Sequence, residues 1–186
     1  MAEDVVLVGG DGVDENFPAV LEPRRALEEE GYSVDVIELY RGFEQAVEED
    51  GSVPEIESRI EAGTHLVGYC AGGVLAYQYI DHPDVLSFTG YDVPSGLRVE
   101  DRELRVDEPV DREDIFLIYA GEIGGRLEGS FAGAEVKDTG HGFDGREQEL
   151  ARAVLHGLEH HSGIGLEDLS ERALEQGVSI FRGLRR

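Results

Sequence analysis

The chain has 186 residues, of which 40% are hydrophobic, 41 are Asp or Glu and only 16 are Lys or Arg, so its formal net charge is −25. This length is enough for one well-packed domain and too short for two ordinary ones. No segment approaches the roughly 18 uninterrupted apolar residues of a membrane helix, and no basic stripe exists to neutralise nucleic-acid phosphates. We therefore expect a single domain over 1–186 that binds neither membranes nor nucleic acids.

The redox state and the compartment follow from two further features. The N-terminal sequence MAEDVVLVGGDG lacks the basic region and long apolar core of a signal peptide. Cys70 is the only cysteine, so no internal disulfide can form. Both features predict a cytoplasmic protein with a free thiol.

The first half of the chain alternates between predicted strands and helices. Residues 4–10 form an apolar run that ends in glycines, as in a strand buried on both faces of a parallel sheet. Helical spacing over 17–31 ends at Gly31, although Pro23 could divide this helix. In chain order, the next segments are predicted as a strand over 32–39, a short helix over 53–63, a strand over 64–69 and a helix over 72–81.

The second half continues the pattern after one irregular segment. Strands are predicted over 85–91, 114–121 and 134–140, while 95–113 has little helical periodicity and is expected to form a long excursion or a small hairpin. Two amphipathic helices follow, over 145–161 and 166–184. Alternating strands and helices predict a three-layer α/β/α fold with a mainly parallel sheet of about six strands, with 162–186 as a C-terminal helical extension.

Cys70 lies in a G-x-C-x-G box, Gly68 to Gly72, between a predicted strand and a predicted helix. Such a box is typical of a nucleophile elbow, in which flanking glycines let a strained turn pass its neighbours. The helix that follows is expected to favour the thiolate, and the amide of Ala71 to donate to an oxyanion. A buried apolar cysteine is the alternative interpretation.

His141 is the candidate general base because it follows the last short strand, in KDTGHGF. Loops at the carboxyl edge of a parallel sheet collect the reactive groups of such folds. Surface or helix-end roles are expected for the other five histidines. His65 lies at the start of the third predicted strand, His82 lies in HPD, and the remaining three fall in or just after the 145–161 helix: His156, His160 and His161.

The motifs GYCAGG and GHGF, with the opening strand, loop, helix and second strand, resemble the α/β-hydrolase superfamily and its dienelactone hydrolase branch most of all. The resemblance extends to about residue 161 and implies a minimal form of that fold, without the two antiparallel strands that often precede it. It also implies that the loop at Gly10 and Asp11 supplies the second oxyanion donor. The expected substrate is a small ester, lactone or thioester, cleaved through an acyl-enzyme.

The acid of the implied triad is the point at which the chain departs from the family. Family members usually place Asp in a G-x-x-D pattern after the fifth strand, where this chain has Gly124. Glu122 could reach inward instead, or Asp92 could serve from the end of the preceding strand, and a Cys-His pair without a third member is also open.

Two alternatives to this hydrolase are kept, a non-catalytic binding protein that retains the elbow and a glutamine amidotransferase-like cysteine enzyme. The expected partner is a small-molecule substrate, with neither metal nor cofactor implied, and a homodimer is left open.

The excess of acidic residues resembles that of proteins from extremely halophilic archaea. The acids are spread along the chain and mixed with apolar residues, which argues against an acidic tail. At about 0.01 M salt charges act over a Debye length of about 30 Å, which falls to about 3 Å at 1 M. Their mutual repulsion is therefore expected to be largely screened in a high-salt cytoplasm.

The thermal midpoint of unfolding is expected to climb steeply between low salt and molar KCl because screening removes this repulsion. Differential scanning fluorimetry in KCl and in sodium sulfate measures it, since sulfate also strengthens apolar burial. A midpoint that is flat in KCl would contradict the halophilic interpretation, and a rise confined to sulfate would assign the effect to apolar burial.

Overall fold

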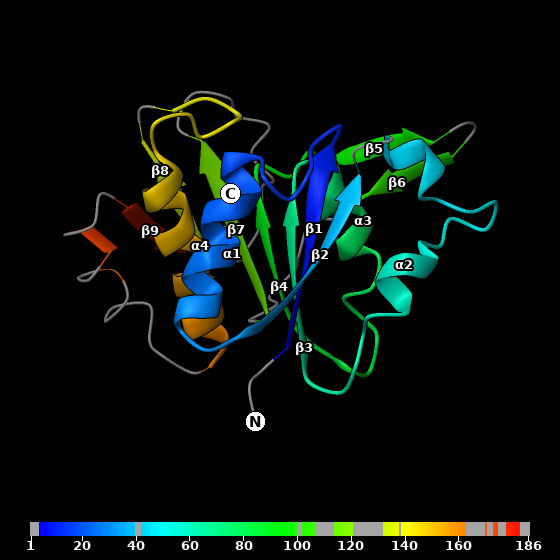
Figure 1. The fold of residues 1–186 in the computed structure, drawn as a ribbon, viewed down its shortest axis with the longest axis horizontal. Helices are drawn as coiled ribbons and strands as arrows, with labels where there is room; N and C mark the ends of the chain where they lie inside the picture. Colours follow the sequence, from blue (N-terminus) through cyan, green and yellow to red (C-terminus); the bar gives the residue numbers. More distant parts are fainter. Residues whose placement is uncertain are drawn as a thin grey trace.

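The structure is a computed structural model, which describes residues 4–39, 42–99, 102–106, 114–120, 132–137, 139–162, 170, 173–174 and 178–182. Its centre is a seven-stranded sheet in the order β2-β1-β3-β4-β7-β8-β9 (Figure 1). Six strands run parallel and match the six predicted ones: β1 (Asp4–Asp11), β2 (Ser33–Leu39), β3 (Thr64–Tyr69), β4 (Val85–Tyr91), β7 (Ile115–Ala120) and β8 (Ala132–Val136).

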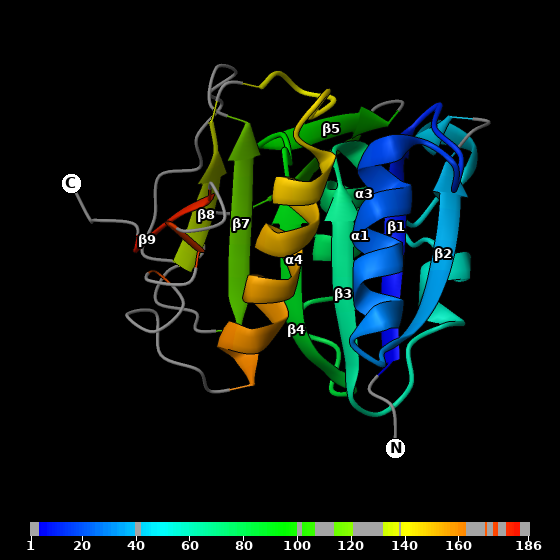
Figure 2. The same ribbon diagram turned by 60° about the vertical axis from the view of Figure 1, so that its left-hand side comes forward.

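Helices cover both faces of this sheet, as the alternating sequence predicts (Figures 1 and 2). On one face lie α1 (Pro18–Glu29) and α4 (Glu147–His161), and on the other lie α2 (Pro54–Glu57) and α3 (Ala71–Tyr77). Two buried clusters fill the space between the layers, one containing Leu27 and Leu158 and the other Ile56 and Leu75. The predicted three-layer α/β/α fold is therefore confirmed.

Several predicted boundaries change in the structure. Helix α1 runs through Pro23 without being divided, and the helix predicted over 53–63 contracts to the four residues of α2. The irregular segment forms a small antiparallel hairpin of β5 (Gly96–Val99) and β6 (Arg102–Arg105). A short 3-10 helix, η1 (Phe43–Gln45), follows β2. None of the described helices is long and apolar enough to cross a membrane.

The C-terminal helix predicted over 166–184 is wrong for its last part. Residues 178–182 form strand β9 (Val178–Arg182), which pairs antiparallel with β8. The sequence there, VSIFR, alternates apolar and polar residues at its start and is rich in strand-forming side chains, and the open edge of β8 supplies a hydrogen-bonding partner. The helical spacing of apolar residues before residue 178 led to the prediction of one continuous helix, so this strand was missed.

Candidate active site

Cys70 stands at the turn between β3 and α3 in a conformation that few side chains adopt. Its backbone angles are φ 50° and ψ −122°, and it is one of three non-glycine residues with positive φ in the described chain. The Cys70 N–H donates to the Tyr91 carbonyl at 3.1 Å, and the Gly73 N–H donates to the Cys70 carbonyl at 3.0 Å. The chain therefore turns from strand to helix within a single strained residue, as an elbow requires.

Glycines allow this turn because backbone lies where their side chains would be. A Cβ on Gly68 would overlap the backbone of Gly73, and one on Gly72 would overlap the backbone of Gly9. The glycines of the box are thus needed for the elbow to pack against β1, which is the physical reason that the motif was informative.

The candidate base and one candidate acid lie together at the same edge of the sheet. His141 Nδ1 and Asp92 Oδ2 are 2.5 Å apart, with 47% of the His141 side chain exposed and only 6% of Asp92. Asp92 directly follows β4 at φ 51°, and its N–H donates to the Ile118 carbonyl at 2.8 Å. With Nδ1 facing the carboxylate, Nε2 is the imidazole nitrogen left for a thiol.

The loop that carries His141 is anchored by the residue two positions later. Phe143 is fully buried, and its ring meets that of Tyr91 edge-on with centroids 6.3 Å apart. The Phe143 N–H donates to the Gly140 carbonyl at 2.9 Å, which closes the turn around the histidine. This turn brings the imidazole to the end of β3, where its ring stacks on Tyr69 with centroids 5.5 Å apart.

The electrostatics of Cys70 differ from the prediction. Burial raises the pKa of the thiol, and the charges of Asp92 and Asp11 raise it further, while a hydrogen bond from the Ala71 amide lowers it. The thiol pKa is thus raised, whereas the sequence predicted a lowered one. A raised pKa favours the neutral thiol, so ionisation of Cys70 calls for a base.

Burial also raises the pKa of the Asp92 carboxyl, although its hydrogen bond to His141, the charge of His141 and a backbone hydrogen bond from Ala120 all act to lower it. The carboxylate is thus kept in a largely dehydrated position by the contacts that orient the histidine. Such a group stabilises an imidazolium more strongly than a fully solvated one does.

Of the remaining predicted site residues, the structure describes Gly10 and Asp11. Gly10 lies against the nucleophile, since a Cβ built on it would be 3.3 Å from Cys70 Cβ. Asp11 Oδ1 accepts a hydrogen bond from the Phe43 N–H at 3.0 Å, so it ties the predicted oxyanion loop to η1. Glu122 lies outside the described residues.

Two of the histidines that were expected at the surface are buried in the structure. His65 is buried within β3, where its Nδ1 lies 2.7 Å from Ser87 Oγ, and His156 is buried in α4, 2.9 Å from a carboxylate oxygen of Glu159. His65 lies in β3, a strand with neighbours on both sides, and His156 lies on the buried face of α4, so both side chains are covered. Within the described part of the chain, no group of three His, Cys, Asp or Glu side chains is arranged to hold a metal ion.

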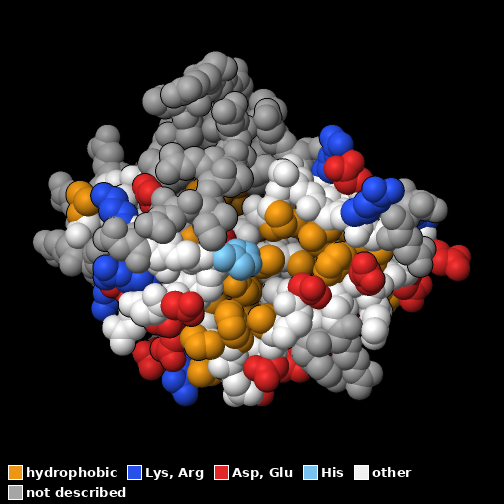
Figure 3. Space-filling model, turned by 90° about the horizontal axis from the view of Figure 1, so that it is seen from above, with side chains coloured by type: hydrophobic (Ala, Val, Ile, Leu, Met, Phe, Trp, Pro, Cys, Tyr) orange, Lys and Arg blue, Asp and Glu red, His pale blue; other side chains and the backbone are white. Residues whose placement is uncertain are grey.

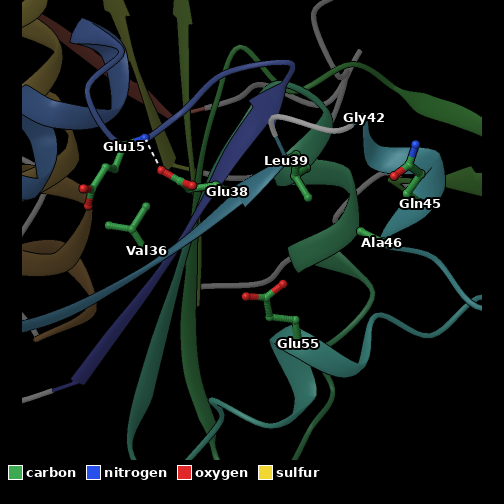
Figure 4. A pocket seen from close by; sticks show the side chains of 8 residues that line it. All are labelled: Glu15, Val36, Glu38, Leu39, Gly42, Gln45, Ala46 and Glu55. Atoms are coloured by element: carbon green, nitrogen blue, oxygen red, sulfur yellow. Dashed lines mark hydrogen bonds between the residues drawn. The ribbon is translucent and has the colours of Figure 1, made fainter.

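Seen from the carboxyl ends of the strands, hydrophobic side chains gather around an exposed histidine, with acidic side chains nearby (Figure 3). A separate cavity of about 610 Å³ lies at the outer edge of β2 (Figure 4). Its lining includes Glu15, Glu38 and Glu55, and the Glu15 N–H donates to Glu38 Oε1 at 2.9 Å. None of the predicted site residues that the structure describes lines this cavity.

Comparison with known proteins identifies the fold. No family model and no curated protein matches the chain. A solved protein from Xanthomonas campestris pv. campestris, assigned to the α/β hydrolase superfamily, superposes with a TM-score of 0.58 at 13% identity, covering 84% of this chain and 98% of its own. The esterase domain of a Rhodothermus marinus protein gives 0.56 at 16% identity, with 86% of each chain covered.

Est1E from Butyrivibrio proteoclasticus gives a TM-score of 0.59 at 9% identity, covering 88% of this chain and 89% of its own. At such identities the likeness shows the fold, and the arrangement is α/β-hydrolase-like, as the sequence predicted.

Alkylation of Cys70 by iodoacetamide is expected to be slower at neutral pH than that of a small-molecule thiol, and to accelerate as the pH rises toward the raised thiol pKa. Asp11→Asn keeps the Oδ1 acceptor for Phe43 and removes only the charge. It should speed labelling on the order of two- to five-fold at low salt and have no effect in molar KCl, where the charge is screened.

Asp81→Asn, on an exposed turn after α3, is the matched control and should leave the labelling rate unchanged. Equal rates for Asp11→Asn and the wild type at low salt would contradict this electrostatic account of the thiol.

Proposed function

We propose that the protein is a hydrolase of small esters, lactones or thioesters, with Cys70 as nucleophile, His141 as general base and Asp92 as the acid of the triad. One observation carries the proposal, the 2.5 Å contact between Asp92 Oδ2 and His141 Nδ1. The imidazole of His141 also stacks on Tyr69, the residue before Cys70. Solved proteins of the same fold that are named as hydrolases and esterases support it.

The reaction begins with a proton transfer, since burial favours the neutral thiol at rest. His141 Nε2 takes the proton from Cys70 Sγ as the sulfur attacks the carbonyl carbon, and Asp92 stabilises the imidazolium that forms. The C–S bond forms while the carbonyl π electrons move onto oxygen. Collapse of this tetrahedral intermediate breaks the bond to the leaving group, which takes the proton from His141.

Hydrolysis of the thioester repeats the sequence with water. His141 removes a proton from water, the oxygen attacks the acyl carbon, and the sulfur leaves as a thiolate that regains the proton. In both halves the developing oxyanion would be met by the Ala71 amide and by the backbone at the end of β1, at Gly10 and Asp11. The Ala71 amide already donates to the Cys70 sulfur at rest.

Asp92 is preferred to Glu122 as the acid because its contact with His141 is present in the structure. An acid at this position can fix the imidazole tautomer, with the proton on Nδ1 and the lone pair on Nε2. The hydrophobic surface around the exposed histidine in Figure 3 suits an apolar acyl group. We also propose that the protein belongs to the dienelactone hydrolase-like branch and works in a high-salt cytoplasm. The proposed reaction needs neither a metal nor a cofactor.

Substitution of the triad tests the assignment in an assay with a generic activated ester at high salt. His141→Ala should lower kcat/KM by a factor on the order of 10²–10⁴, the contribution of a positioned acid-base group. Asp92→Asn should lower it strongly as well, because the amide favours the wrong tautomer, while Glu122→Gln should have little effect.

Thermal midpoints measured in parallel control for loss of folding. Strong loss in Glu122→Gln with none in Asp92→Asn would reassign the acid, and equal, negligible effects would leave a Cys-His pair. Full activity of His141→Ala would overturn the proposed base.

The two alternatives give different results in the same experiment. A binding protein that retains the elbow would react with iodoacetamide at Cys70 and show no turnover of any ester, lactone or thioester. A glutamine amidotransferase-like enzyme would release ammonia from glutamine, which a coupled ammonia assay detects.

A further inference from the structure

Tyr69, the residue immediately before Cys70, is enclosed by aromatic rings. It is 3% exposed at the end of β3, and its ring stacks on those of Tyr91 and Phe17, with centroids 5.2 and 6.0 Å away. The imidazole of His141 stacks on the same ring at 5.5 Å, with 28° between the planes. A single side chain therefore joins the nucleophile's strand to the base.

The hydroxyl of Tyr69 makes a second contact with the same residue. It donates a hydrogen bond to the main-chain carbonyl of His141 at 3.0 Å, across 72 positions of sequence. Burial raises the pKa of this phenol, and the charges of Cys70, Asp92 and Asp144 raise it further. The hydroxyl therefore stays protonated and remains a donor wherever the enzyme would work.

Gly10 explains how the Tyr69 ring fits beside the nucleophile. A Cβ built on Gly10 would lie 2.9 Å from Tyr69 Cδ1, which is closer than real Cβ contacts. The end of β1 can approach the elbow only because this position carries no side chain. The ring is thus held between the end of β1 and the loop that carries His141.

We propose that Tyr69 is a positioning residue that fixes the imidazole of His141 relative to the Cys70 sulfur. The inference rests on the proposed function for its catalytic meaning. About half of the His141 side chain is exposed, and among the described contacts no hydrogen bond joins it to Cys70. Asp92 holds Nδ1, which leaves the imidazole plane to be set by another group, and Tyr69 supplies a flat surface and a tether to the loop backbone.

The two contacts act on different parts of His141. The ring face restricts rotation of the imidazole and is attracted to the imidazolium that forms during catalysis. The hydroxyl holds the loop backbone so that the Cα of His141 stays in place. Because Tyr69 is bonded to Cys70 through one peptide, both effects are transmitted in a fixed geometry to the sulfur, and misplacement of about 1 Å is enough to cost on the order of 10²-fold in rate.

Two substitutions separate these contacts, and Tyr79→Phe is the matched control. The Tyr79 hydroxyl also donates to a backbone carbonyl, that of Val53 at 3.1 Å, on the other side of the sheet. Tyr69→Phe removes the hydroxyl and keeps the ring, whereas Tyr69→Leu removes both. The readouts are kcat and KM for an activated ester, and the downfield proton NMR signal of the imidazole Nδ1–H that is shared with Asp92.

We expect Tyr69→Phe to lower kcat several-fold with KM unchanged and with the imidazole signal retained. Tyr69→Leu should lower kcat by roughly 10- to 100-fold and broaden or abolish the signal, because His141 is no longer fixed. Tyr79→Phe should match the wild type in all three quantities. Loss in Tyr69→Leu alone, with loss of the signal, would also support the proposal and assign the effect to the ring.

Two results would overturn the proposal. One is a kcat within about two-fold of the wild type in both Tyr69 variants. The other is a lower kcat in Tyr69→Leu with an unchanged imidazole signal, which is what a merely structural role would give. If the wild type turns over no ester, the proposed function fails, and the NMR comparison alone still decides whether Tyr69 holds His141.

Discussion

The positive φ of Cys70 is the constraint on which the rest of the site depends. A non-glycine residue adopts this conformation only when its surroundings impose it, and here they do so from three directions. The Tyr91 carbonyl holds the Cys70 N–H, the amide of Gly73 holds its carbonyl, and the glycines before and after it let α3 pack directly on β1. The strained turn places Cys70 between β3 and α3, at the carboxyl edge of the sheet.

The parallel sheet then brings the other groups to the same edge. Asp92 follows β4, the neighbour of β3, and His141 lies on the loop between β8 and α4. Residues separated by up to 71 positions thus meet because all these strands end on one side (Figures 1 and 2). The arrangement is a property of the topology and needs little from the local sequence beyond the glycines.

Acidic side chains affect the ionisation of the candidate nucleophile, Cys70. Burial raises the pKa of the Cys70 thiol most, and the charges of Asp92 and Asp11 raise it further, so two of the many acidic residues oppose ionisation of Cys70. A neutral thiol resists adventitious oxidation and alkylation, and in the proposed mechanism His141 generates the thiolate when a substrate is bound. On this account the orientation of His141 is the decisive quantity, which gives the contacts of Asp92 and Tyr69 their weight.

Much of the fold was predictable from sequence because parallel strands that are buried on both faces consist mostly of apolar residues. The stretches at 4–10 and 64–69 needed no tertiary information, and GYCAGG indicated the elbow because its glycines answer a local backbone requirement. Strand β9 was missed because a five-residue strand at a sheet edge depends on its partner, which local periodicity does not record.

The candidate site was predictable only in part, for the same reason. The sequence could not decide between Asp92 and Glu122 as the acid, since a chain with 41 acidic residues offers many carboxylates. The contact of Asp92 with His141 becomes visible only in the folded chain. Tyr69 gave no signal apart from its position beside Cys70, because its contact with His141 requires a loop 72 positions away to close over it. The direction of the Cys70 pKa shift was not predicted because its causes, burial and the charges of Asp92 and Asp11, depend on the folded chain and are not visible in the local sequence.

The central claim, that Cys70 forms a covalent acyl-enzyme, is tested most directly by trapping that species. The protein is mixed with a slowly hydrolysed activated ester, quenched in acid and analysed by intact mass and by peptide mapping. The account predicts a mass increase equal to one acyl group on the peptide that contains Cys70, and no such increase in Cys70→Ala. An unmodified protein during steady turnover, or an acyl group on another residue, would contradict it.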